Sequence, residues 1–128
     1  MAYVWIALGS ALGGVLRFWL SGLAAKCVET ALGAPQSMAF LGTVFVNVTG
    51  SFAIGLIAAL GPRPVTEQLF MIGVLGGYTT FSSFSLQTLA LVHEHRWLHA
   101  GANVALSVVL SLLAVWLGHT CGAMLRKS

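Results

Sequence analysis

The stretch that decides the fold is Gly73-Val74-Leu75-Gly76-Gly77-Tyr78-Thr79-Thr80-Phe81-Ser82-Ser83-Phe84-Ser85, which lies inside a long apolar segment. It holds three glycines and five serine or threonine residues. Glycine and adjacent threonines are poor helix formers, yet at membrane depth every backbone N–H and C=O group needs a partner. We therefore predict that residues 76–80 interrupt a membrane helix and free backbone groups that can bind ions. The alternative is a continuous helix whose glycines serve close packing.

The composition indicates that the rest of the chain lies in a membrane. Of the 128 residues, 58% are hydrophobic and only 7% are charged, whereas soluble domains carry about 25% charged residues. Four apolar segments each reach the ~20 residues of a spanning helix, at about 2–25, 38–60, 67–92 and 97–121. We expect an all-α membrane protein with one four-helix transmembrane domain over residues 1–128, its third helix broken near the middle. The net charge of +3 is spread along the chain and gives no support to nucleic-acid binding.

Polar and aromatic side chains recur at helical spacing in three of these segments. The three stripes are Thr43, Asn47 and Ser51; Phe81, Phe84, Ser85 and Thr88; and His99, Asn103, Ser107 and Ser111. Residues three or four positions apart share one helix face. Taken singly, such residues are explained by interhelical hydrogen bonds, aromatic packing or serine bonds to the preceding turn. Because three stripes occur together, we interpret them as a polar pathway.

The remaining charged and sulfur-containing residues define no site by themselves. Arg17 lies well inside the first span, where it either faces protein, water or an interface or extends toward the nearer headgroups. The loop around His93 and His95 lacks a closed set of metal ligands, so we interpret it as solvated. Cys27 and Cys121 fall on opposite faces of the membrane, beyond disulfide reach, and are interpreted as structural thiols.

The basic loop residues give almost no orientation bias. Arg63, Arg126 and Lys127 fall on the side of the termini, and Lys26 and Arg96 fall on the other side. A chain without such bias can insert in both directions. Since four helices can hardly enclose a pore, we hypothesise an antiparallel, dual-topology homodimer in which both helix interruptions meet at the two-fold axis. Their carbonyl groups would there surround a dehydrated cation.

Residues 76–84, Gly-Gly-Tyr-Thr-Thr-Phe-Ser-Ser-Phe, resemble the G-G-x-T-T-F-S-T-F signature of the Fluc (CrcB) fluoride channels, with Ser83 where threonine is usual. Gly42-Thr43 followed by Asn47 resembles that family's G-T-x-x-x-N segment, and Arg17 fits as a vestibule or interface charge. The resemblance covers nearly the whole chain. It implies a dual-topology homodimer with two pores in the bacterial inner membrane. Such a channel passively exports cytoplasmic fluoride and protects the cell against its toxicity.

The resemblance also implies which residues act. Phe81 and Phe84 would turn ring edges toward fluoride, and Asn47 would donate to it from its amide. Hydroxyl groups would come from Thr43, Thr80, Ser82, Ser83, Ser107 and Ser111. Backbone carbonyls of Gly76 and Thr79 would hold a central structural sodium ion. This chemistry suits a small, strongly hydrated anion, because neutral donors and ring edges replace its water without binding it too tightly.

Two other functions account for part of the pattern. A small proton-coupled exporter can also be a four-helix antiparallel dimer, but it needs a titratable group inside the membrane. The acids, Glu29, Glu67 and Glu94, all lie in or beside loops. A packing subunit of a larger membrane complex would explain small-residue pairs such as Gly9 and Gly13 but not the three stripes. No nucleophile–base pair or metal set indicates an enzyme.

Overall fold

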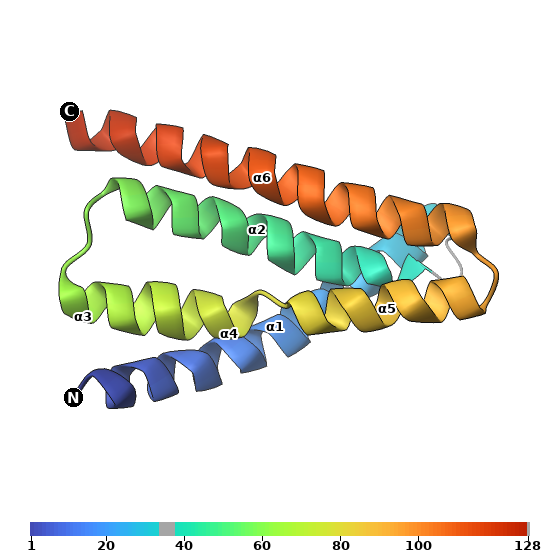
Figure 1. The fold of residues 1–128 in the computed structure, drawn as a ribbon, viewed down its shortest axis with the longest axis horizontal. Coiled ribbons are helices and arrows are strands. Elements are labelled where there is room, and N and C mark those ends of the chain that lie inside the picture. Colours follow the sequence, from blue (N-terminus) through green and yellow to red (C-terminus); the bar gives the residue numbers. More distant parts are fainter. Residues whose placement is uncertain (34–37, 128) are drawn as a thin grey trace.

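The structure, a computed structural model, describes residues 1–33 and 38–127. Within these ranges the secondary structure is helical without any strand (Figure 1). Four helical spans are long and apolar enough to cross a membrane, over Ala2–Ala31, Phe40–Ala59, Pro64–His93 and Trp97–Lys127. The prediction of an all-helical, multi-pass membrane protein with four spans is therefore confirmed.

The first and last helices are longer than their apolar segments. Helices α1 (Ala2–Leu32) and α6 (Trp97–Lys127) have 31 residues each, whereas we expected them to end near residues 25 and 121. A helix of this length extends about 46 Å, beyond the ~30 Å of hydrocarbon, so charged residues such as Lys26 continue the helix into the headgroup region. Helix α1 ends at Gly33 with φ 58°, a left-handed conformation that costs glycine little.

The third span consists of several segments around an irregular middle. It runs through α3 (Pro64–Thr66), the π-helical η2 (Glu67–Leu75), α4 (Gly76–Tyr78) and α5 (Phe81–His93). Only Thr79 (φ −78°, ψ 153°) and Thr80 (φ −148°, ψ 117°) are extended. The glycines are helical, which corrects the expected interruption at 76–80 to its last two residues.

Gly77 packs closely against α1. A Cβ atom on Gly77 would lie 2.6 Å from the Ser10 carbonyl oxygen, and one on Gly13 would collide with the Val74 carbonyl. The packing interpretation therefore applies to Gly77 but not to Gly76, where a Cβ would meet only Met71 O at 3.9 Å, and the two threonines leave the helical conformation.

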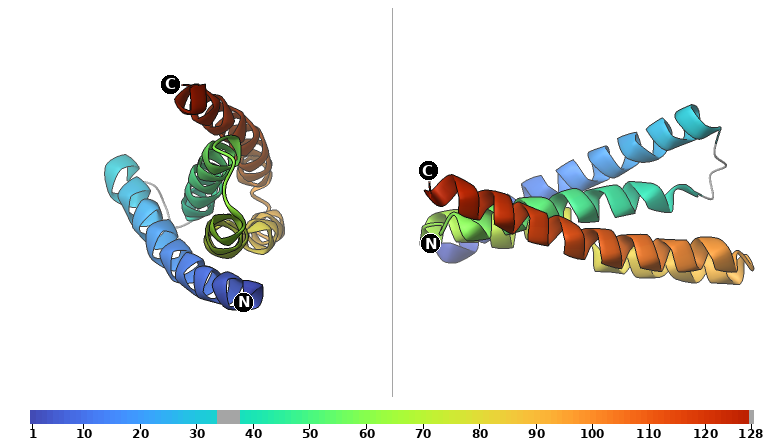
Figure 2. Two further views of the ribbon diagram at one scale, coloured as in Figure 1. Left: turned by 90° about the vertical axis from the view of Figure 1, so that its left-hand side faces the viewer. Right: turned by 90° about the horizontal axis from the view of Figure 1, so that it is seen from above.

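Helix α2 (Phe40–Ala59) lies between α6 and the third span and is central to the molecule (Figure 1). Its contact with α6 also depends on glycine, because a Cβ atom on Gly118 would collide with the Phe52 carbonyl. The first half of α1 follows η2 and α4, and Ser21 and Ala25 then approach Gly42 of α2. Only toward its C-terminal end does α1 diverge from the other helices (Figure 2). Both chain termini lie at one end of the molecule, beside the turn between α2 and α3 (Figure 1).

Candidate functional site

Asn47 of α2 holds Thr80, the second of the two extended threonines, in place. Its Oδ1 accepts a hydrogen bond from Thr80 N–H at 2.7 Å, and its Nδ2 donates to the Thr80 carbonyl at 3.1 Å. An extended residue inside a membrane protein needs partners for both backbone groups. Asn47 supplies both from another helix, which explains how the interruption is tolerated.

This pairing alters the backbone bonds on both sides of Thr80. In a continuous helix the Thr80 N–H would donate to the Gly76 carbonyl, four residues earlier, but here it is directed to Asn47. The Thr79 carbonyl precedes Thr80, the N-cap of α5, and so lies outside the ladder of that helix. Gly76 is exposed, and a Cβ atom there would meet only Met71 O at 3.9 Å. Two carbonyl groups thus leave the helical ladders at mid-span.

The Thr80 side chain caps the following helix. Its Oγ1 accepts from Ser83 N–H at 3.2 Å and also lies 3.1 Å from Ser83 Oγ. The Ser82 hydroxyl is 3.3 Å from the same oxygen, but Ser82 is exposed and lines neither of the two cavities described below. The N-terminus of α5, which is the positive end of the helix dipole, therefore lies beside Asn47.

A cavity of about 390 Å³ gathers most of the predicted pathway residues between α2, the third span and α6. They are Asn47, Ser51, Thr80, Phe81, Phe84, Ser107 and Ser111, and Gly76 and Thr79 line the same cavity. The two phenylalanine rings are 5.2 Å apart and inclined by 52°. Phe84 is 8% exposed, whereas Phe81 is 78% exposed. Within the described residues, the buried Ser111 Oγ has no hydrogen-bond partner.

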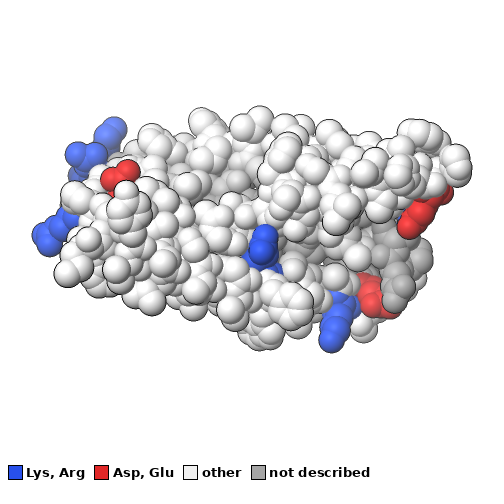
Figure 3. Space-filling view, turned by 60° about the horizontal axis from the view of Figure 1, so that its bottom comes forward, with Lys and Arg blue, Asp and Glu red and all other residues white. Residues whose placement is uncertain are grey.

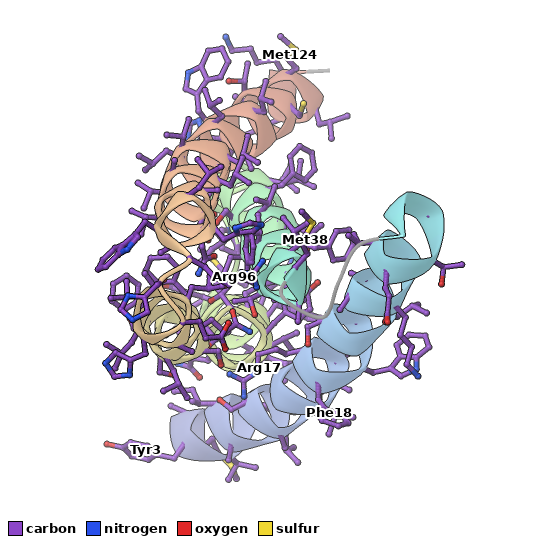
Figure 4. All side chains as sticks on the ribbon, turned by 90° about the vertical axis from the view of Figure 1, so that its right-hand side faces the viewer. Tyr3, Arg17, Phe18, Met38, Arg96 and Met124 are labelled. Atoms are coloured by element: carbon purple, nitrogen blue, oxygen red, sulfur yellow. The ribbon has the colours of Figure 1, made fainter. Side chains whose placement is uncertain are left out.

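A second cavity, of about 220 Å³, lies across Thr80 from the first and contains Arg17, Thr43, Ser83 and Gln87. Arg17 projects from α1 toward the neighbouring helices (Figure 4). On the face drawn in Figure 3, one basic side chain stands mid-molecule, apart from the charged residues at both ends. The expected stripe in α2 is thus divided, because Thr43 borders this cavity while Asn47 and Ser51 border the first.

Sequence reasoning missed Gln87, whose buried Oε1 lacks a partner within the described residues. Its spacing, four residues after Ser83 and seven after Thr80, is the signal that could have indicated it.

The expected single face of α5 is also divided. Phe84 and Thr88 face α6, where Asn103 Nδ2 bonds Thr88 Oγ1 at 2.9 Å. Ser85 is exposed and its hydroxyl donates to the Phe81 carbonyl at 2.9 Å. The helix starts only at Phe81, and its packing on α6 buries one side of the predicted stripe. In α6, Ser107 and Ser111 reach the first cavity, whereas His99 borders neither of the two.

The charged residues, histidines and cysteines near the ends of the helices form no site in the described residues. Glu94 and Arg96 approach to 3.8 Å, and His95 has φ 57° in an exposed turn. No group of three potential metal ligands among His, Cys, Asp and Glu occurs in the residues that the structure describes. Both cysteines are free and exposed.

Four membrane-spanning helical segments, with a cavity between them that is lined by neutral polar, aromatic and aliphatic side chains, define a multi-pass membrane protein. Residues 4–119 match the family described as CrcB-like protein, Camphor Resistance (CrcB). The chain therefore belongs to the CrcB family, and the resemblance drawn from residues 76–84 is confirmed.

Curated relatives of this family cover the whole chain. A protein of Rhodospirillum rubrum named fluoride-specific ion channel FluC is 52% identical over 99% of this chain and 98% of its own length. Proteins with the same name from Methylocella silvestris and Paramagnetospirillum magneticum are 49% and 47% identical, each over 99% of this chain and over 97% and 99% of their own lengths. Because these relatives are ion channels, the expectation that the chain is not an enzyme is confirmed.

Proposed function

We propose that this protein is a passive, fluoride-selective channel. The observation that carries the proposal is the first cavity, where an amide, hydroxyls and two ring systems meet at Thr80 without a carboxylate among its lining residues. The names of its relatives support fluoride as the ion. One N–H of Asn47 Nδ2 serves Thr80, which leaves the second for an ion in the cavity. Ser111 Oγ and the edges of Phe81 and Phe84 add further weak contacts.

The second cavity would serve as the approach to this path. Arg17 raises the local concentration of anions there but stands outside the first cavity, so it does not hold the ion on its path. Thr43 and Ser83 supply neutral contacts in this second cavity. Of the two roles expected for Arg17 from the sequence, a vestibule or an interface charge, this proposal adopts the vestibule charge.

A second, inverted copy would complete the path. Phe81 and Gly76 are exposed near the middle of a span, where exposed polar backbone is unfavourable against lipid. A partner covering this side would enclose two equivalent pathways, one for each subunit.

A labelling experiment tests the antiparallel arrangement. Cys27 and Cys121 are exposed and must first be replaced. A single cysteine at Glu94, whose side chain is 62% exposed, should then react with a membrane-impermeant reagent on about half of the subunits. Labelling of all subunits from one side contradicts dual topology.

The Gly76 and Thr79 carbonyls fit a structural sodium ion in such a dimer. Both leave the helical ladders, and hard cations bind oxygen ligands of this kind. When bound, sodium would supply positive charge between carbonyls that otherwise face one another in an apolar region. Long incubation without sodium should dissociate dimers in size-exclusion chromatography, whereas brief sodium gradients should drive no fluoride flux. Dimers that persist unchanged without sodium contradict this role.

The rival function is proton-coupled export, and a flux experiment separates it from a channel. Fluoride-loaded liposomes containing the protein should still release fluoride when the proton gradient is collapsed, provided that valinomycin lets potassium balance the charge. Efflux that stops on collapse of the proton gradient favours coupled exchange. In bacteria, where we place the protein in the inner membrane, export of cytoplasmic fluoride should restore growth of a fluoride-sensitive strain.

A further inference from the structure

Asn103 of α6 is completely buried and has three hydrogen-bond partners. Its Nδ2 lies 2.9 Å from Thr88 Oγ1 and 3.4 Å from the Phe84 carbonyl oxygen. Its Oδ1 lies 3.3 Å from Ser107 Oγ, one helical turn further along α6. Asn103 therefore joins the phenylalanine-bearing helix to a hydroxyl group of the first cavity.

The direction of each bond follows from the available protons. The Phe84 carbonyl can only accept, and it already accepts the Thr88 hydroxyl proton at 2.8 Å. Thr88 Oγ1 must then accept from Asn103, so the amide nitrogen faces α5 and Oδ1 faces Ser107. Since Oδ1 carries no proton, Ser107 is the donor in the remaining bond.

Ser107 thus directs its single proton at Asn103 and not into the cavity that it lines with Asn47 and Phe84. An anion that reaches Ser107 first meets oxygen lone pairs, and the hydroxyl must rotate before it can donate. We propose, on the basis of the proposed fluoride path, that Asn103 is a positioning residue. It holds the Ser107 hydroxyl proton in a hydrogen bond, turned away from the cavity, while no ion is bound there. Binding at Ser107 is thereby weakened, which lets the ion leave and favours conduction.

The variant that tests this role is Asn103→Leu, which keeps the branched shape of the side chain but has no acceptor for Ser107. A permanently available hydroxyl should lower the half-saturating fluoride concentration for liposome efflux about fivefold, as expected for one hydrogen bond. The maximal efflux rate should fall as well, because the ion leaves more slowly. In a Ser107→Ala background, Asn103→Leu should no longer shift the half-saturating concentration.

Thr88→Val is the matched control, because it weakens the same contact between α5 and α6 but keeps the bond from Ser107 to Asn103. It should leave the half-saturating concentration at the wild-type value. The same shift in Thr88→Val, or a lower maximal rate in Asn103→Leu without any shift, overturns the proposal. Asn103→Ala, which adds no atoms to the interface, carries the same expectation if the leucine variant fails to assemble.

The wild-type protein, measured in the same series, separates this proposal from the proposed function. If wild-type liposomes release no fluoride, the channel itself is contradicted. If the wild type conducts and both Asn103 variants behave like it, only the positioning role of Asn103 is overturned.

Discussion

Asn47 and Thr80, 33 residues apart in the sequence, form a reciprocal pair in which the asparagine amide bonds both the N–H and the C=O group of the threonine, at 2.7 and 3.1 Å. The pair stands where the two cavities meet, because Thr80 lines both. The same side chain therefore maintains the irregular backbone and faces the proposed ion path. The alternatives of interhelical contact and polar pathway, left open by the sequence, do not exclude each other.

Replacement of Asn47 tests both roles. Asn47→Ala should reduce fluoride efflux about tenfold or more, because it removes a donor to the ion and leaves two Thr80 backbone groups unpaired. Asn47→Asp keeps an acceptor for Thr80 N–H but adds negative charge to the path, so it should also block efflux. Size-exclusion chromatography should show dimers for the aspartate variant. Normal efflux in Asn47→Ala would show that Asn47 serves only as a contact between helices and does not act on the ion.

The phenylalanine pair is tested by Phe81→Ile and Phe84→Ile. Each keeps apolar bulk but removes the polarised ring edge, and efflux should fall about fivefold for a contact of about 1 kcal/mol. The Phe84→Ile variant should also have a lower melting temperature, because Phe84 is only 8% exposed. The Phe81→Ile variant should not melt earlier as an isolated subunit, because Phe81 is 78% exposed. Efflux equal to the wild type in both variants would mean that the rings serve packing alone.

The glycine contacts between helices give a stability prediction. Gly118→Ala should lower the free energy of unfolding by about 1–3 kcal/mol, because its Cβ would collide with the Phe52 carbonyl. Gly101→Ala on the same helix is the control, since a Cβ there meets nothing within 4 Å. Thermal unfolding in detergent measures both. Equal melting temperatures of the two variants would contradict close packing of α2 on α6.

The sequence was sufficient to predict the spans and the irregular stretch, because apolar length and poor helix formers are local properties. It assigned Gly77 to the helix interruption, whereas Gly77 is helical and packs against Ser10. That contact depends on how α1 crosses the third span. It likewise treated Asn103 as one member of a polar stripe. The partners of Asn103 on α5 follow from the packing of two helices, which periodicity within one helix does not specify.

The most direct test of the central claim is fluoride efflux from liposomes that contain the wild-type protein and valinomycin, recorded with a fluoride electrode. Fluoride should leave these liposomes rapidly, whereas chloride loaded in the same way should be retained. Fluoride release no faster than from protein-free liposomes, or equal release of chloride, would contradict a fluoride-selective channel.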